Sequence, residues 1–354
     1  MASINQIATL ISTIGATNTV VVRGEPGIGK SSLLKMLKES FGDAYDYIYI
    51  DCPLFDLPDF GLPYVKDGVT YYALNDVWKF SSAKPKIIML DEVSKAPPVL
   101  KPLFTRLMLE RTAGNRPLPD GSIVFGTGNL ETDGVGDTMQ GHISNRITSI
   151  KMDKPSNDAW IMWGEAHGVD PMVLATVHQL THCLASYTDL AEMENNKRGD
   201  FNNHIYHPQR NNKAYVSPRS LEKAGNIVEK RAILGDELTM LALIGTVGES
   251  FARDMDGYMG AADLLPAWES IEANPMKAKL LTDPHKEACA QMLLVFASVR
   301  RVTKENAEAY TKYFTRYDEN VSSIWMRQFK HSLDKVMHVP EFKKALIANH
   351  WIFQ

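Results

Sequence analysis

The chain has 354 residues, of which 44% are hydrophobic and 23% are charged, and its formal net charge is −4. These values are typical of a globular protein with two or three domains, and they exclude a surface coated with basic residues, although not a basic pore. No apolar run is long enough to cross a bilayer, and the first residues lack the pattern of a signal peptide, which predicts a cytoplasmic protein.

The first part of the chain alternates strand and helix patterns. An apolar helical face over Ile4–Ile14 is followed by a β-branched strand at Thr19–Arg23 and a helix at Ser31–Ser40. Four more strands are predicted, at Tyr47–Ile50, Lys86–Leu90, Ser122–Thr127 and Ile147–Met152. Several of these strands are continuously apolar, as expected where both faces are covered. The pattern therefore predicts an α/β fold, with a parallel sheet sandwiched between helices.

Strand patterns stop after Lys154-Pro155, and the rest of the chain is predicted to be helical. The expected helices are Asn157–Ala166, Pro171–Leu190, Pro218–Leu234 and Glu237–Met255, with further helices beyond Gly260. A polar stretch at Glu194–Tyr215 is expected to form an exposed loop. We therefore expect an α/β domain over 1–154, an all-α region over 155–256 and a C-terminal helical region over 257–354.

A phosphate-binding motif follows the first strand. The pattern G-x-x-x-x-G-K-[ST] needs glycines because the backbone must fold tightly and point its N–H groups at phosphate oxygens. The next helix would present its positive end to the same anion. Lys30 is expected to contact the β- and γ-phosphates of ATP, and Ser31 to bind Mg²⁺. The predicted nucleotide-binding residues are Gly24, Glu25, Pro26, Gly27, Ile28, Gly29, Lys30, Ser31 and Ser32.

Two carboxylates end the apolar strand that precedes them, in the order Leu90-Asp91-Glu92. Parallel strands deliver their last residues to the edge of the sheet where ligands bind. We expect Asp91 to hold Mg²⁺ through water, and Glu92 to act as the base for the attacking water. Alone, such a pair is more often a solvated strand end. The upstream phosphate motif favours the functional interpretation.

Together with Gly126-Thr127-Gly128-Asn129, these motifs resemble those of AAA+ ATPases, over about residues 20–152 and more weakly to about 234. The stretch Asp91–Pro98 is similar to the "DE-x-x-x-A-P-P" sequence of the MoxR branch, and Leu107–Arg111 is similar to its "M-x-E-x" helix end. The resemblance implies an AAA+ core, a helical lid and a further helical domain. The chain beyond Gly260 matches no pattern that names a client.

The resemblance assigns further roles, each with a simpler alternative. Asn129 would be the polar sensor that orients the lytic water, or an ordinary turn residue. Arg146 would be the arginine finger that acts on the neighbouring subunit, because a planar cation stabilises the transferring phosphoryl group, or a surface arginine. Arg219, at the start of a capped helix, would be the second sensor that closes the lid, or a surface residue at a helix end.

Two segments resemble the insertions of this branch: a hairpin at Tyr64–Tyr71 with an Asp-Gly turn, and Arg111–Gly121. They would contact clients, or be ordinary surface hairpins. The resemblance implies a homohexameric chaperone that remodels a protein client, with a partner that carries a von Willebrand factor type A domain. The alternatives are a nucleic-acid motor, which the net charge disfavours, and a nucleotide-switched scaffold, which the intact Asp91-Glu92 pair disfavours. The arginines of the second insertion could grip nucleic acid, but a solvated face is the preferred interpretation of Arg106, Arg111 and Arg116.

Overall fold

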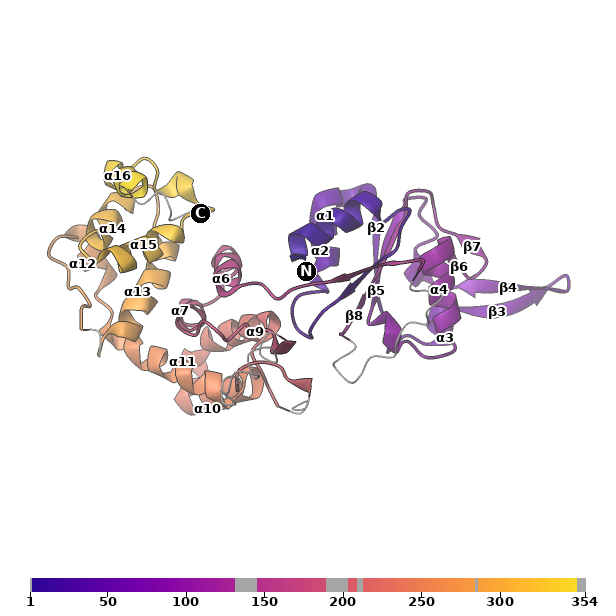
Figure 1. Cartoon of the computed structure of the whole chain (residues 1–354), viewed down its shortest axis with the longest axis horizontal. Helices are drawn as coiled ribbons and strands as arrows, with labels where there is room; N and C mark the ends of the chain where they lie inside the picture. The colour runs from indigo at the N-terminus through magenta and orange to yellow at the C-terminus, as the bar shows by residue number, and fades with distance from the viewer. Residues whose placement is uncertain (1, 131–144, 189–202, 209–212, 284–285, 349–354) are drawn as a thin grey trace. The chain divides into compact units, whose positions relative to one another are not determined.

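The computed structural model describes residues 2–130, 145–188, 203–208, 213–283 and 286–348 (Figure 1). The chain forms two compact units. The first contains residues 1–155 with 206–211, and the second contains 156–205 with 212–354. Within the described ranges, every helix is too short or too polar to cross a bilayer.

The first unit is built on a five-stranded parallel sheet. Its spatial order is β2-β5-β8-β1-β9, so the first strand lies inside the sheet and is paired on both sides. The strands are β1 (Val20–Arg23), β2 (Asp46–Asp51), β5 (Lys86–Asp91), β8 (Ile123–Gly128) and β9 (Thr148–Lys151). Each predicted strand is found within two residues of its expected ends.

Helices cover both faces of this sheet. They are α1 (Ile4–Ile14), α2 (Ser32–Phe41), α3 (Leu57–Phe60) and α4 (Lys101–Glu110). Neighbouring residues of one strand face opposite sides, so Ile87 and Met89 pack with α1 and α2, whereas Ile88 and Leu90 pack with α4. The two buried clusters confirm the predicted αβα sandwich.

Two small hairpins interrupt the pattern at the places where insertions were predicted. The first pairs β3 (Gly61–Lys66) with β4 (Val69–Leu74) and extends away from the sheet (Figure 1). Its turn residues, Asp67 and Gly68, both have positive φ angles, of 52° and 74°, as a two-residue hairpin turn requires. The second pairs β6 (Thr112–Ala113) with β7 (Arg116–Pro117).

The second unit is helical over its described residues and has one continuous apolar core, which runs from Trp160 to Phe342. Its helices are α6 (Asn157–Ala166), α7 (Pro171–Gln179), α9 (Pro218–Val228), α10 (Arg231–Val247), α11 (Glu249–Ala261), α12 (Trp268–Ala273), α13 (Ala288–Arg301), α14 (Ala307–Phe314), α15 (Glu319–Arg327) and α16 (Pro340–Ala348). The predicted all-α character is confirmed. The further division at residue 256 stays a prediction.

Several predicted helix ends in this unit are wrong. Helix α7 ends at Gln179 and not at residue 190, and the segment predicted as Pro218–Leu234 is split after Val228. Gly248, with φ 87°, separates α10 from α11 inside the segment predicted as Glu237–Met255. By contrast, Gly235, with φ 72°, kinks α10 in the gap between two predicted helices. Helical periodicity continues across Gly248 because the apolar face continues, so the pattern alone does not mark this break.

Candidate functional site

The predicted phosphate loop connects β1 to α2, and its backbone is shaped by glycines. Gly27 and Gly29 have φ angles of 78° and 98°, a region that favours glycine. A side chain at Gly24 would lie 2.5 Å from Ile28 Cδ1 and 3.0 Å from Met152 O, so this position has no room for one. Ser31 is the N-cap residue of α2, and Ser32 is the first residue of this helix. The loop therefore lies at the positive end of a helix.

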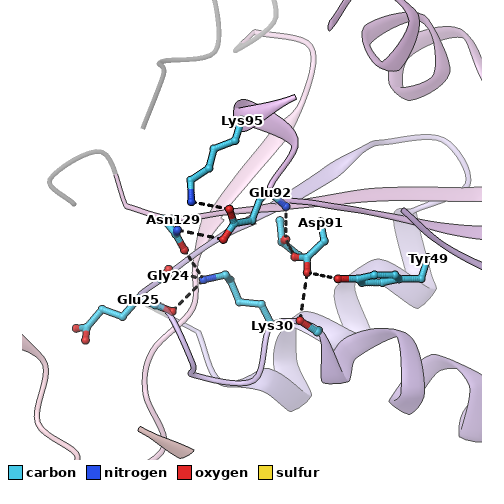
Figure 2. Close-up of polar contacts among 10 residues, drawn as sticks. Gly24, Glu25, Lys30, Tyr49, Asp91, Glu92, Lys95 and Asn129 are labelled. Atoms are coloured by element: carbon cyan, nitrogen blue, oxygen red, sulfur yellow. Dashed lines mark hydrogen bonds and ion pairs between the residues drawn. The ribbon is translucent and has the colours of Figure 1, made fainter. Parts of the chain in front are cut away.

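Lys30 is buried and lies at the centre of the loop. Its Nζ donates to Gly24 O at 2.6 Å, to Glu25 O at 2.9 Å and to Asn129 Oδ1 at 3.0 Å (Figure 2). An ammonium group carries three hydrogens. A phosphate oxygen would therefore bind Lys30 by replacing one of these acceptors. Asn129 Oδ1 is the acceptor that can move aside most easily, because it belongs to a side chain and the other two are backbone carbonyls.

The backbone and the side chain of Glu25 have different roles in the loop. Its backbone carbonyl faces Lys30, whereas its carboxylate forms an ion pair of 2.7 Å with Lys154. Both side chains are about 95% buried, at 4% and 5% exposure. This pair ties the phosphate loop to the chain just after β9, so the side chain of Glu25 supports the loop and its backbone helps to form the cradle.

Asp91 ends strand β5 at the same sheet edge as the loop. Ser31 Oγ lies 3.3 Å from Asp91 Oδ2, and Tyr49 Oη donates to the same oxygen at 2.8 Å (Figure 2). Thr127 Oγ1 donates to the other oxygen, Oδ1. Mg²⁺ prefers oxygen ligands and commonly binds through one or two carboxylates and water. The oxygens of Ser31 and Asp91 therefore fit a magnesium ion.

Glu92 follows Asp91 in a left-handed backbone conformation with φ 51°. This conformation is uncommon for a residue other than glycine, and it is held by the Glu92 N–H, which donates to Thr127 Oγ1 at 3.1 Å. The carboxylate is held from two sides: Lys95 Nζ lies 2.5 Å from Oε2, and Asn129 Nδ2 lies 3.3 Å from Oε1. The backbone turn thus directs Glu92 toward the phosphate loop, away from Asp91's partners (Figure 2).

Three separate segments therefore meet at one sheet edge. The loop after β1 supplies Lys30, the end of β5 supplies the two carboxylates, and the residue after β8 supplies Asn129, which contacts both Lys30 and Glu92. The strand pairings β1–β8 and β5–β8 place these ends side by side.

Cys52, which follows strand β2, is not part of this chemistry. Burial raises the pKa of the Cys52 thiol, and the charges of Asp91 and Asp51 raise it further, so Cys52 is not an activated nucleophile.

The two predicted arginines belong to other segments of the chain. Arg146 is exposed in a turn that precedes β9. Because the strands are parallel, this turn lies at the amino edge of the sheet, opposite the phosphate loop of the same chain. Arg219 is exposed on the first turn of α9, whose N-cap Ser217 forms a capping box with Ser220. It belongs to the second unit, and its role stays a prediction.

The arginines near the second insertion are engaged within the first unit. Arg106 pairs with Glu110 at 2.7 Å, and the Arg116 guanidinium lies 4.3 Å from the centre of the Phe80 ring. Arg111 is half-buried: its guanidinium donates to Thr19 Oγ1 at 2.7 Å, to Gly15 O at 2.9 Å and to Met108 O. Burial lowers the pKa of Arg111. The preferred interpretation as a solvated face is therefore wrong for Arg111, which fixes α4 to the loop between α1 and β1.

Three contacting residues were not identified from the sequence. Thr127 and Lys95 lie within the motifs, but the motifs predict no role for either residue. Tyr49 lies on β2, outside every motif, and its only sequence signal is its place near the end of a strand next to β5. The contacts of Tyr49 and Thr127 with Asp91 depend on strand order and register, which the local sequence does not encode, whereas Lys95 lies only three residues after its partner Glu92.

No protein-family model matches this chain, and no curated protein matches it. Among solved structures, the Thermotoga maritima RuvB Holliday junction branch migration motor is 9% identical, with 74% of this chain and 68% of that chain covered and a TM-score of 0.35. Brucella abortus NtrX in complex with ATP is 13% identical, with 99% and 68% covered and a TM-score of 0.38. At such identities and TM-scores, neither protein lends its family or its activity to this chain.

Proposed function

We propose that this chain is a Mg²⁺-dependent ATPase of the AAA+ class, of the MoxR-like branch. The observation that carries the proposal is the meeting of Lys30, the Asp91-Glu92 pair and Asn129 at one edge of a parallel sheet, around a glycine-shaped loop. Each residue type suits one part of phosphoryl transfer, and the residues come from three segments far apart in the sequence. A structural turn rich in glycine would not need these partners.

The arrangement suggests a role for each side chain. Lys30 and the loop backbone would bind the β- and γ-phosphates of ATP. Mg²⁺, held by Ser31 and through water by Asp91, would neutralise charge on the phosphates. Glu92 would take a proton from water as the water oxygen bonds to the γ-phosphorus and the bond to ADP breaks, while Asn129 orients that water. These steps yield ADP and phosphate.

Two substitutions test this chemistry. Glu92→Gln keeps the size of the side chain but removes the base and replaces one of its two acceptor oxygens with an NH2 group, so we expect ATP to bind with unchanged affinity and turnover to fall by at least about a hundredfold. Lys30→Ala removes the central cation of the loop, and nucleotide binding should be lost. Equal turnover in Glu92→Gln and the unmodified protein, measured by phosphate release, would contradict the proposed mechanism.

We propose that the enzyme works as a ring, with six subunits as the expected number. The support is the placement of Arg146 at the amino edge of the sheet, away from the phosphate loop of its own subunit. An arginine finger in that place would act on a neighbour, and Arg219 would act as the second sensor within its own subunit. Mixing Arg146→Ala with Lys30→Ala subunits should restore part of the ATPase activity, because some interfaces then combine an intact loop with an intact finger. Absence of any recovery in the mixture would count against the finger.

For the biological role, we propose remodelling of a protein client, with a partner that carries a von Willebrand factor type A domain. The inward contacts of Arg111 support this over a nucleic-acid motor, because they remove one of the three arginines of the second insertion from the surface. A pull-down with the Glu92→Gln variant in ATP, with and without nuclease, distinguishes the two. Protein partners that survive nuclease support remodelling, whereas partners that disappear with the nucleic acid support the motor.

A further inference from the structure

Three hydroxyl groups surround the carboxylate of Asp91. Thr127 donates to Oδ1, and both Ser31 and Tyr49 lie within hydrogen-bond distance of Oδ2 (Figure 2). The Tyr49 contact, at 2.8 Å, is shorter than the Ser31 contact, at 3.3 Å. Oδ2 is therefore the oxygen that faces the proposed magnesium ligand Ser31, and a phenol from another strand holds it there.

The position of Tyr49 follows from strand pairing. Strand β2 is the edge strand next to β5, in a register that pairs Asp51 with Asp91. Ile48 and Ile50 pack on the face that α4 covers, so Tyr49, which lies between them, stands on the opposite face. That face carries α2, and Ser31 directly precedes α2.

Packing alone does not account for this tyrosine. Its side chain is 47% exposed, so the ring adds little to the buried core. Its polar end meets an ionised oxygen, and hydrogen bonds of this kind are roughly twice as strong as those between neutral groups. Carboxylates that bind metals are themselves held by hydrogen bonds, and loss of such a bond typically weakens metal affinity by about 10- to 100-fold.

We propose that Tyr49 is a positioning residue of the magnesium site, which fixes the Asp91 oxygen that faces Ser31. The inference rests on the proposed Mg²⁺-dependent function and deepens it. Tyr49 acts through Asp91, and its hydroxyl affects nucleotide binding only when the metal is present. Removal of the hydroxyl should therefore weaken the contribution of the metal and leave the metal-free interaction unchanged.

The test compares the affinity for a fluorescent ADP analogue in excess Mg²⁺ and in EDTA, because ADP avoids turnover. For the unmodified protein, the dissociation constant in EDTA divided by the dissociation constant in Mg²⁺ measures what the metal contributes. In Tyr49→Phe we expect this ratio to fall by about tenfold, with the value in EDTA unchanged. A merely structural defect would weaken binding in both conditions.

Tyr47→Phe is the matched control, since Tyr47 lies two residues earlier on the same strand and donates to Gly42 O at 2.7 Å, away from Asp91. Its ratio should equal that of the unmodified protein. An unchanged ratio in Tyr49→Phe, or an equal fall of the ratio in Tyr49→Phe and Tyr47→Phe, would overturn the inference and leave the ATPase proposal standing. If Mg²⁺ does not strengthen ADP binding to the unmodified protein, the metal site itself is wrong and both proposals fall.

Discussion

A buried carboxylate in the helical unit gives a pH-dependent prediction. Burial raises the pKa of Glu165 from its ordinary 4.5 to about 7, against the opposing effect of the nearby Arg300 and Lys335, and its Oε1 is buried with no hydrogen-bond partner among the described residues. At about 1.4 kcal/mol per pH unit, this difference disfavours the charged form by about 3 kcal/mol in the folded state. Below pH 4.5 the group is protonated in both states and has no such cost.

The direction in which the free energy of unfolding changes with pH follows from proton binding. Between pH 4.5 and about 7 the folded state keeps the Glu165 proton that the unfolded chain releases, so the free energy of unfolding falls as the pH rises, and the loss is complete above about pH 7. Glu165→Gln is neutral at every pH and avoids this loss. Relative to the unmodified protein, the variant should therefore gain stability with pH, from about zero near pH 4 to about 3 kcal/mol at pH 8.

Urea unfolding of both proteins at pH 5 and pH 8 measures this difference. Glu222→Gln serves as the control, because Glu222 is exposed on α9, and its effect should be the same at both pH values. The reasoning is refuted if the stability difference between Glu165→Gln and the unmodified protein does not change between pH 5 and pH 8.

Three further predictions concern single contacts. Asp46→Asn should cost about 3 kcal/mol of unfolding free energy, because it leaves the fully buried ammonium of Lys86 without its ion pair of 2.5 Å; a cost below about 1 kcal/mol in urea unfolding would contradict this. Lys95→Met should lower ATP turnover by about ten- to a hundredfold with unchanged ADP affinity, since Glu92 loses one of the two groups that position it; unchanged turnover would show that Lys95 is dispensable. Gly248→Ala should cost about 2 kcal/mol or more, because its φ is 87° and a side chain would lie 2.7 Å from a backbone carbonyl; a melting temperature equal to that of the unmodified protein would count against it.

The sheet and the order of the site residues along the chain could be predicted, because both follow from local patterns. Continuous apolar runs marked strands such as Ile87–Leu90, and motif spacing placed charged residues at their ends. Contacts across the sheet could not be predicted in the same way. Tyr49 meets Asp91 only because β2 pairs with β5 in one register, and this register depends on packing over both faces of the sheet.

Arg111 illustrates a second limit of sequence patterns. Three arginines spaced by five residues suggested a common exposed face, yet the chain turns at Arg111 with φ 53°, and its side chain enters the interior beside Gly15 and Thr19. A left-handed residue after a helix reverses the direction of the side chain, and no property of arginine itself indicates that this will happen. One predicted helix in the second unit failed for a similar reason, because Gly248 breaks the segment Glu237–Met255 with φ 87°.

The projecting β3–β4 hairpin has a consequence for association between chains. It exposes apolar side chains, among them Leu62, Val65 and Val69, and such ribbons tend to recruit further strands. Counting back from the two-residue turn, Lys66 is in a hydrogen-bonded pair and Pro63 is at a position whose nitrogen faces outward. Proline has no N–H to offer there, and Lys66, at the turn end of the same strand, adds a charge. The edge formed by β3 therefore offers fewer backbone donors to an added strand than its exposed apolar side chains alone would suggest.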